Sequence, residues 1–488
     1  MSKRRGLVVA ASLIGLIVVI YGGASLQLYL SARGAIANVK KISTQLSNVA
    51  TSGPGLATHL AELSGTMLRI EHQINRPFWR PMVWVSGQSV KFEQLQNSIV
   101  EGRALLAVAP GLLGIDSPRR YLIAFQNPAE ARGTGGIIGG YASIEVDKGH
   151  VKVLRLGSNA QLHSLEAPPI FISKDFSDIY GTDPGIWQNS NMSPHFPYGA
   201  QIWLALWQRQ FNENLDGVIA VDPIAMSYLL KVIGPVTMAD NRVITSENIV
   251  QETLSLEYQR FASANALRKS YLTEIARAIL QRMTAGNYSK VQLGRQLYTP
   301  WMDGRLLFYS AHPSEESALA KTHFGGVLNS DAKNEFRAVV ENTAGNKMDY
   351  YLDRVIRIRS LSCSPLRQTE ISVTLTNTVS ASAKLPAYVV GRLDLKAPNG
   401  EGNSHGVSLF IYGPPGATLT SGKTVGSPEN SSVVGRELAR SVLITRVNLT
   451  PGKAQSIRAT FSGGSGPISY ISQPLVRPDS VEIKDSCR

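Results

Sequence analysis

An uncharged stretch near the start of the chain constrains its fold and location most. Basic residues at positions 3–5 come directly before Gly6–Leu30, which contains no charged side chain. About 20 apolar residues in a helix cross the hydrocarbon core of a bilayer, so we expect residues 6–30 to form one transmembrane helix. Because basic flanks favour the cytoplasm, residues 1–5 are predicted to be a cytoplasmic tail and the bulk of the chain extracytoplasmic. A cleavable signal peptide is the alternative.

The charge of the chain is strongly basic. The formal net charge is +13, of which the cytoplasmic cluster supplies three. A basic exterior suits anionic lipid headgroups or acidic cell-wall polymers, whereas no nucleic-acid recognition motif is present. The bilayer and an acidic cell-wall polymer are therefore the expected partners, and no nucleic acid is expected. A role of the excess charge in solubility alone is the simpler explanation.

The sequence contains two cysteines, Cys363 and Cys487. Both lie on the predicted oxidising side of the membrane, where disulfides form and persist. We therefore predict a disulfide between them, which would tie the start of the C-terminal region to the end of the chain. Two free, buried thiols are the alternative.

Residues 31–115 have a helical pattern, interrupted at residues 51–55 and 76–85. Apolar residues recur there at alternating steps of four and three, the spacing of one helical face packed on a partner. We expect a membrane-proximal helical stalk or hairpin whose partner is a neighbouring helix of the same chain. The residues of this seam are Leu56, Leu60, Leu63, Met67, Ile70 and Ile74.

Residues 116–345 show strands that alternate with helices, which predicts a layered α/β domain. A buried strand is expected at Gly217–Val221, followed by a helix that Asp222 caps, Pro223 begins and Gly234 ends. Further expected elements are a strand at 119–127, two strands that meet at a turn near 147–149, a helical region at 246–283 and a strand at 305–310.

Residues 346–488 lose the helical pattern. Short stretches of alternating apolar and polar residues recur there between glycine, proline and serine turns. This pattern predicts an all-β sandwich as the C-terminal domain.

The segment Gln126–Tyr141, QNPAEARGTGGIIGGY, is expected to form a loop after the first strand and is the main candidate binding site. Arg132 offers a planar cationic fork that suits phosphate or carboxylate, and glycines let backbone N–H groups approach an anion. The structural alternative is a Glu130–Arg132 ion pair over a tight strand connection. The candidate anion-binding residues here are Asn127, Glu130, Arg132, Gly135 and Gly136.

Sequence motifs for catalysis are missing. The sequence has no HExxH, G-x-S-x-G or P-loop pattern, and its eight histidines lack metal-ligand spacing. Asp175, Asp178 and Asp183 form an acidic stretch that a surface turn explains better than a metal loop. Trp203 and Trp207, one helical turn apart, are more typical of a core than of a sugar platform. We therefore assign no metal site and no catalytic residue.

A long segment from Tyr121 resembles the hallmark of a known bacterial family. YLIAFQNPAEARGTGGIIGGYASIEVDKGHVKV is similar to the N-x-x-E-x-R-x-T-G-G-F-I-G type segment of the domain-of-unknown-function family numbered four thousand and twelve. SPHFPYGAQI, LDGVIAVDPIAMSYLLKVIGPV and NKMDYYLDRVIRI continue the resemblance, from about residue 35 to the end. It implies an N-terminal membrane helix, an exported domain and an actinobacterial or related origin, without a known activity.

The order of elements in the central domain also resembles the LytR-CpsA-Psr phosphotransferases, which move glycopolymers from a polyprenyl-pyrophosphate carrier onto peptidoglycan. This resemblance implies a pyrophosphate-binding role for Arg132, and NALRKSYL nominates Arg268 and Lys269 for the same role. Where those enzymes have a metal-binding Asp after the first arginine, this chain has Thr134-Gly135-Gly136. Phosphoryl transfer without a metal leaves developing charge poorly neutralised, so a binding domain without the chemistry is favoured.

The sequence thus predicts a membrane-anchored envelope protein that binds a phosphorylated or acidic ligand as a non-catalytic or accessory factor. A phosphotransferase acting on a polyprenyl-pyrophosphate substrate is one alternative, and a divalent metal is expected only in that case. A structural scaffold for protein partners is another.

Overall fold

A computed structural model gives the structure of most of the chain. The residues it describes are 56–74, 89–262, 264–395, 402–424 and 432–487. The predicted cytoplasmic tail and transmembrane helix lie outside these ranges. Within the described ranges, no helix combines the length and the apolarity that crossing a bilayer requires.

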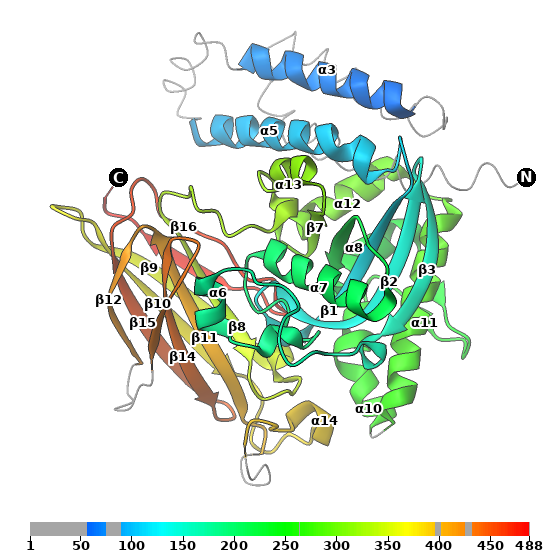
Figure 1. Ribbon diagram of the computed structural model, residues 1–488. Helices are drawn as coiled ribbons and strands as arrows, with labels where there is room; N and C mark the ends of the chain where they lie inside the picture. The colour runs from blue at the N-terminus through cyan, green and yellow to red at the C-terminus, as the bar shows by residue number, and fades with distance from the viewer. Residues whose placement is uncertain (1–55, 75–88, 263, 396–401, 425–431, 488) are drawn as a thin grey trace, which may run out of the picture.

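Two helices, α3 (Leu56–Ile74) and α5 (Ser89–Leu112), form a hairpin above the rest of the molecule (Figure 1). The buried residues of the predicted α3 seam are Leu60, Leu63 and Met67. They belong to one apolar cluster with Ile99 and Leu105 of α5, so the partner of the seam is a helix of the same chain. Because this cluster continues to Tyr121 and Ile123, the hairpin is packed directly on the α/β unit.

A mixed five-stranded sheet, in the order β3-β2-β1-β4-β7, forms the centre of the α/β unit. β1, β2 and β3 form an antiparallel meander, β4 is parallel to β1, and β7 is antiparallel to β4. The strands are β1 (Arg119–Arg132), β2 (Gly135–Asp147), β3 (His150–Ser158), β4 (Gly217–Val221) and β7 (Leu306–Ser310), with a small pair formed by β5 (Val236–Thr237) and β6 (Val243–Ile244). The expected turn at 147–149 is present, because Asp147 pairs with His150.

Helices cover both faces of this sheet. Trp203 and Trp207 of α7 are fully buried against one face, so they are core residues. α5, α8, α11 and α12 cover the other face. The helices of the unit are α6 (Lys174–Tyr180), α7 (Phe196–Phe211), α8 (Pro223–Ile233), α9 (Ile249–Gln251), α10 (Glu257–Phe261), α11 (Asn265–Ala285), α12 (Lys290–Met302) and α13 (Pro313–Leu319), with single turns η1 (Asn159–Gln161), η2 (Asp183–Gly185) and η4 (His323–Gly325).

Local signals explain where α8 begins. Asp222 caps the helix, because its side chain accepts a hydrogen bond of 2.7 Å from the backbone N–H of Ala225, and Pro223 occupies the first helical position. The helical region expected at 246–283 is interrupted. The π-helical segment η3 (Glu252–Leu256) joins α9 to α10, and the left-handed backbone of Ala262, with φ of 37°, separates α10 from α11.

The C-terminal region is a sandwich of two five-stranded sheets around one apolar core. The outer sheet contains β12 (Thr418–Thr424), β15 (Ala454–Ser462), β10 (Gln368–Asn377), β9 (Leu352–Ser362) and β17 (Ser480–Lys484). The inner sheet contains β13 (Val433–Glu437), β14 (Arg440–Leu449), β11 (His405–Pro415), β8 (Glu335–Asn342) and β16 (Ser469–Tyr470). β8 precedes residue 346, where the sequence pattern changes, and it pairs with β11 inside the sandwich. One short helix, α14 (Ala387–Val390), lies between β10 and β11.

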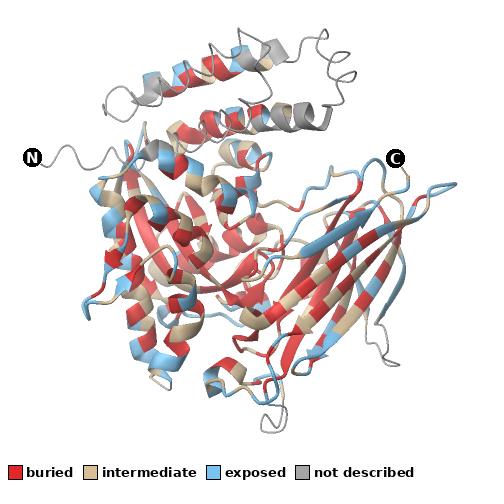
Figure 2. Cartoon of the chain, turned by 180° about the vertical axis from the view of Figure 1, so that it is seen from behind, coloured by how far each residue is buried: buried red, intermediate tan, exposed pale blue. Residues whose placement is uncertain are grey.

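The inner sheet is covered on both sides. One side faces the sandwich core, and on the other side Val339, Phe410 and Tyr412 share an apolar cluster with Trp203 of α7. Figure 2 shows the corresponding continuous band of buried residues between the two units. The α/β unit and the sandwich therefore share a buried interface.

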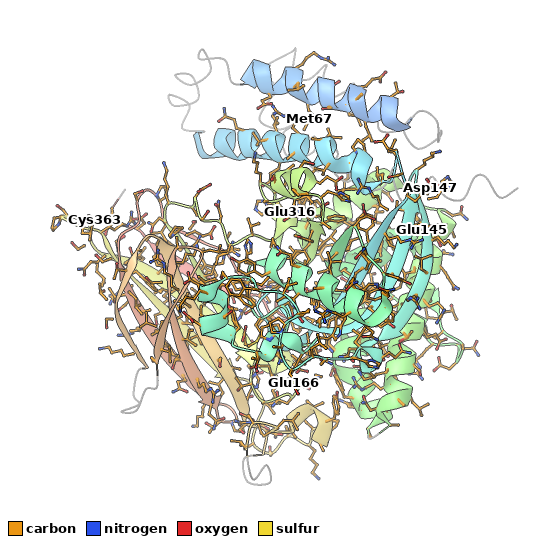
Figure 3. All side chains as sticks on the ribbon, in the orientation of Figure 1. Met67, Glu145, Asp147, Glu166, Glu316 and Cys363 are labelled. Carbon is orange, nitrogen blue, oxygen red and sulfur yellow. A yellow bond between two sulfur atoms is a disulfide. The ribbon has the colours of Figure 1, made fainter. Side chains whose placement is uncertain are left out.

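The predicted disulfide between Cys363 and Cys487 is present, with a Cα–Cα separation of 5.4 Å. Cys363 lies at the end of the sandwich remote from the α/β unit (Figure 3). The bond follows β17, which pairs in parallel with β9, so it fixes the last strand to the edge of the outer sheet.

Candidate functional site

The segment Gln126–Tyr141 is a β-hairpin rather than the predicted loop. Arg132 pairs with Gly135, so Gly133 and Thr134 form a two-residue turn. Three residues, 128–130, bulge out of β1 between its pairings with Ile137 and Gly136. A Cβ at Gly136 would lie 2.1 Å from the carbonyl oxygen of Asn127. The glycines of this segment therefore allow the close approach of two strands at the bulge.

The Arg132 side chain is buried, and its guanidinium faces acceptors of the protein. Nε and Nη2 donate to Oδ1 of Asn189 at 3.1 and 2.8 Å. Nη1 donates to the backbone oxygens of Ala131 and Asn342, at 2.7 and 3.0 Å. Glu130 lies 3.7 Å away. Arg132 thus connects the hairpin to β8 of the sandwich. This geometry is close to the structural alternative for the segment, which is an ion pair between Glu130 and Arg132 over a tight strand connection.

Gly135 and Gly136 also lie at the interface between the two units. Gly135 has a φ of 130°, and a Cβ there would lie 3.3 Å from Pro474. The carbonyl of Gly136 accepts a hydrogen bond of 3.0 Å from Nδ2 of Asn191, which also donates to Thr134. Asn191 therefore connects the Thr134 side chain in the turn to the start of β2.

Two other predicted residues, Arg268 and Lys269, belong to a group of charged side chains that also includes Glu130. Two carboxylates and three cations form what we call the basic cluster, whose members are Glu130, Glu257, Arg268, Lys269 and Lys347. Lys347 donates to Glu130, and Arg268 donates to Glu257 at 3.2 Å. Lys269 donates to Asn159. With both carboxylates ionised, the basic cluster retains one positive charge in excess.

Two tyrosines hold Arg268 in place. Its guanidinium lies 4.9 Å from the ring centre of Tyr258 and 4.5 Å from that of Tyr388, and these two rings stack. Such cation–π contacts strengthen when they are shielded from water. The Tyr258 hydroxyl accepts a hydrogen bond of 3.1 Å from Nδ2 of Asn127, which links the start of the bulge to the cluster.

Burial shifts the ionisation of two groups in the basic cluster. It raises the pKa of Glu257 to about 7, against the opposing charge of Arg268. It lowers the pKa of Lys269 to about 8, and the neighbouring charges of Arg268 and Lys347 contribute in the same direction. Both shifts reflect a poorly hydrated site, and the neighbouring cations add to the shift of Lys269 while they oppose that of Glu257.

Lys269 lies at a narrow apolar pocket, which we call the slot. Its volume is about 80 Å³, and it lies between the β1–β2–β3 meander and α11. Gly139, Gly140 and Gly157 line it on the sheet side, and Asn127 lines it beside the bulge. Its apolar lining includes Phe125, Met226, Leu254, Leu272 and Ile275. A cation with an apolar enclosure beside it suits a ligand that is anionic at one end and apolar at the other.

A larger cavity of about 660 Å³ lies between the two units, and the turn Gly133-Thr134 lines it. Two of its arginines already have partners. Arg305 donates to Asp222 at 2.7 Å and to the backbone oxygen of Leu475 at 2.6 Å. Arg337 donates to Glu335 at 3.1 Å and to the backbone oxygen of Val327 at 2.9 Å. The hydrogen bonds of both arginines are therefore directed to groups of the chain itself.

The part of the chain that the structure describes contains no group of three or more His, Cys, Asp or Glu that could hold a metal ion. Of the three aspartates of the acidic stretch, Asp175 and Asp178 lie one turn apart in α6, and Asp183 lies outside this helix. Asp175 lies in the first turn of α6, and Asp183 begins η2. Asp178 pairs with Lys174 at 2.5 Å.

Reasoning from sequence missed four members of this site: Tyr258, Glu257, Lys347 and Tyr388. Lys347 follows β8 and Tyr388 lies in α14, so both come from the C-terminal unit. No spacing in the sequence relates them to Asn127 or Lys269, because the contacts depend on how the two units pack.

A comparison with known families bears on the same region. Residues 116–258 match the family described as Protein of unknown function (DUF4012). The matched segment contains the hairpin, Asn127, Glu130, Glu257 and Tyr258. It ends before the three cations of the basic cluster, and it is shorter than the resemblance expected from residue 35 to the end.

No curated protein matches the chain. Among solved structures, a proposed nutrient binding protein from Legionella pneumophila is 9% identical over 28% of this chain and 44% of its own length, with a TM-score of 0.17. The chain thus spans less than half of that protein, and the similarity is too low to indicate a common fold.

Proposed function

We propose that the α/β unit binds an anionic ligand with a slender apolar part, as a non-catalytic factor in cell-envelope assembly. The anionic group would lie against Lys269 and the apolar part in the slot. The observation that carries this proposal is the position of the Lys269 side chain, which lines an apolar pocket and belongs to a cluster with an excess of positive charge.

The energetics of the basic cluster support an anion. A buried amine whose pKa is lowered by burial and by neighbouring cations is stabilised in its charged form when an anion binds beside it. The slot is about half the size of an engineered cavity of roughly 150 Å³ that holds benzene, so it suits a thin alkyl or isoprenoid segment.

The envelope role rests on the predicted export of the chain. The disulfide supports an oxidising compartment, and the order of elements in the α/β unit resembles the LytR-CpsA-Psr proteins. A phosphorylated or acidic envelope component is then the ligand, and residues 6–30 provide the anchor in the same proposal. Arg268 acts as a positioning residue, since its guanidinium contacts both tyrosine rings.

Calorimetric titration with n-octyl phosphate tests the proposal, because this probe carries one phosphate on a thin chain. We expect measurable binding of octyl phosphate and much weaker binding of inorganic phosphate. Lys269→Met keeps the length of the side chain without its charge and should reduce the affinity about tenfold. Arg277→Met is the matched control, since Arg277 is an exposed cation on the same helix.

Gly139→Ala tests the slot independently. A Cβ at Gly139 would make ordinary contacts of 3.6 Å with Asn127 and 3.7 Å with Phe125, so the variant should fold while reducing the free space. We expect this variant to bind octyl phosphate more weakly and to bind inorganic phosphate with unchanged affinity. Equal binding by Lys269→Met and the unmodified chain would disprove the proposed site.

A further inference from the structure

The outer sheet of the sandwich has a face that no other part of the described chain covers. Its inward side packs in the sandwich core through residues such as Ile356, Val373 and Ile457. Figure 1 shows β12, β15, β10 and β9 on the side of the molecule away from the α/β unit. This differs from the inner sheet, both sides of which are buried.

Strand register places cations in a row across this outer face. Lys423 of β12 lies opposite Arg458 of β15, which lies opposite Ser372 of β10. Ser372 in turn lies opposite Arg357 of β9, and Arg357 opposite Glu482 of β17. Neighbouring strands are about 4.8 Å apart, so the row presents charges at regular intervals across the sheet.

The next row on the same face adds Arg359 and Lys484, together with Glu370. Glu370 receives a hydrogen bond of 2.9 Å from Arg359, and Glu482 accepts one of 3.2 Å from Arg357. The two rows thus hold five cations and two carboxylates. The carboxylates gather at the β9 side, which leaves the β12–β15 side purely cationic.

Lys423 and Arg458 form a like-charge pair. Both are exposed, and neither has an acidic partner within the described residues. Like charges directly opposite one another on antiparallel strands are destabilising. A bound anion would remove this repulsion. The other cations of the two rows would extend the attraction along a chain of anionic groups.

The remaining residues of the face indicate the chemistry of that chain. They are mainly hydroxyl side chains, among them Ser372, Thr374, Ser456 and Thr460. The only aromatic residue in the five strands is Phe461, which is buried in the core. Stacking of bases, on which binding of single-stranded nucleic acid depends, therefore has no platform here, whereas hydroxyl groups suit the hydrogen-bonding surface of sugars.

We propose that the outer sheet of the sandwich binds a linear acidic polysaccharide across the row formed by Lys423, Arg458 and Arg357. The row attracts the carboxylates of the polymer, and the hydroxyl side chains contact its sugar rings. This surface is separate from the slot, and the proposal does not depend on Lys269.

The experiment uses the full chain in uncharged detergent and polygalacturonate as the probe, with affinity measured at two salt concentrations. We expect binding that weakens with salt, and a loss of at least about tenfold in Lys423→Ser/Arg458→Ser. The control, Lys152→Ser/Arg277→Ser, removes two exposed cations of the α/β unit and the same charge. It should change the affinity less than twofold.

The outcomes separate the proposal from simple charge attraction. Equal losses in the two double variants would overturn it, because net charge would then explain the binding. Tighter binding of single-stranded DNA than of polygalacturonate would also overturn it. Lys269→Met should bind polygalacturonate normally. A failure of the polysaccharide proposal is therefore distinguishable from a failure of the proposed ligand site at the slot. Both double variants are expected to keep the melting temperature of the unmodified chain, since every replaced side chain is exposed.

Discussion

Lys347, in the C-terminal unit, donates a hydrogen bond to the Glu130 carboxylate in the bulge of β1, 217 positions earlier in the chain. Both side chains are at least nine-tenths buried. Breaking a buried ion pair by removing one partner leaves an uncompensated charge. The contact between the hairpin and the sandwich therefore depends on both residues being present.

Lys347→Met should lower the free energy of unfolding by about 3 kcal/mol, because Glu130 would remain buried with only the more distant guanidinium of Arg132, 3.7 Å away, as a counter-charge. Urea denaturation followed by circular dichroism measures the loss. Lys174→Met is the control, since it removes an exposed ion pair that contributes little to stability. The double variant Glu130→Gln/Lys347→Met should recover part of the stability. A loss in Lys347→Met no greater than in the control would contradict this interpretation.

Arg132→Lys should also destabilise the chain, by about 2–3 kcal/mol. A lysine cannot reproduce the fork that contacts Asn189 and two backbone carbonyls simultaneously. Octyl phosphate affinity, measured on the folded fraction, should stay within about twofold, because Arg132 does not line the slot. If Arg132→Lys were stable but had lost its affinity for octyl phosphate, Arg132 would be the anion-binding residue instead.

Two glycines of the same strand should differ sharply. Gly136→Ala forces a methyl group to within 2.1 Å of a backbone oxygen and should cost more than about 2 kcal/mol. Gly139→Ala makes only ordinary contacts and should stay within about 0.5 kcal/mol of the unmodified chain. Thermal melts of the two variants give the comparison. Similar melting temperatures would refute the interpretation that the bulge requires a glycine at position 136.

Stability should fall as pH rises from 5 to 8. Burial raises the pKa of Glu341 to about 8, against the opposing charge of Arg132. Burial also raises the pKa of Glu316, which lies beneath α5, to about 8 (Figure 3). Because both pKa values are raised in the folded state, their stabilisation is complete below about pH 4.5 and is lost as pH rises through about 8.

We expect this loss to approach about 6 kcal/mol between pH 5.5 and pH 8.0 in urea denaturation, about 3 kcal/mol from each carboxyl. Glu316→Gln should flatten the profile, since it removes one of the titrating groups. A chain that is equally stable at both pH values would show that these carboxyls ionise normally.

Cys363→Ser/Cys487→Ser should lower the free energy of unfolding by about 3–5 kcal/mol, because the disulfide closes a loop of 124 residues. Hydrogen exchange should show the largest loss of protection at β17, an edge strand that pairs with β9 alone among the described strands. Unchanged exchange at β17 would mean that its pairing with β9 is sufficient without the bond.

The sequence allowed prediction of features that depend on neighbouring residues. The cap at Asp222 and the turn after Asp147 follow from local backbone chemistry, and the structure contains both. The mixed α/β unit and the β-rich C-terminal region also follow from periodicity. The glycine-rich segment was misread as a loop, because glycines that permit close strand approach look the same in sequence as glycines of a flexible turn.

The candidate site was only partly predictable. Asn127 and Lys269 were nominated and do line the same pocket, but their connection through Tyr258 and the basic cluster depends on long-range packing. Lys347 and Tyr388 come from the other unit, and nothing in their local sequence distinguishes them from surface residues. The burial of Arg132 likewise depends on Asn189 and Asn342, which are distant in sequence.

The inner sheet of the sandwich has consequences for how the protein unfolds. Since Phe410 and Tyr412 pack against α7 on one side of the sheet while Leu409 and Ile411 fill the sandwich core on the other, neither half has a complete apolar interior alone. The two units should melt in a single cooperative transition. A fragment cut after residue 258, at the end of the matched family segment, would expose the α7 surface and aggregate, so the smallest independently folding part of this protein includes its C-terminal half.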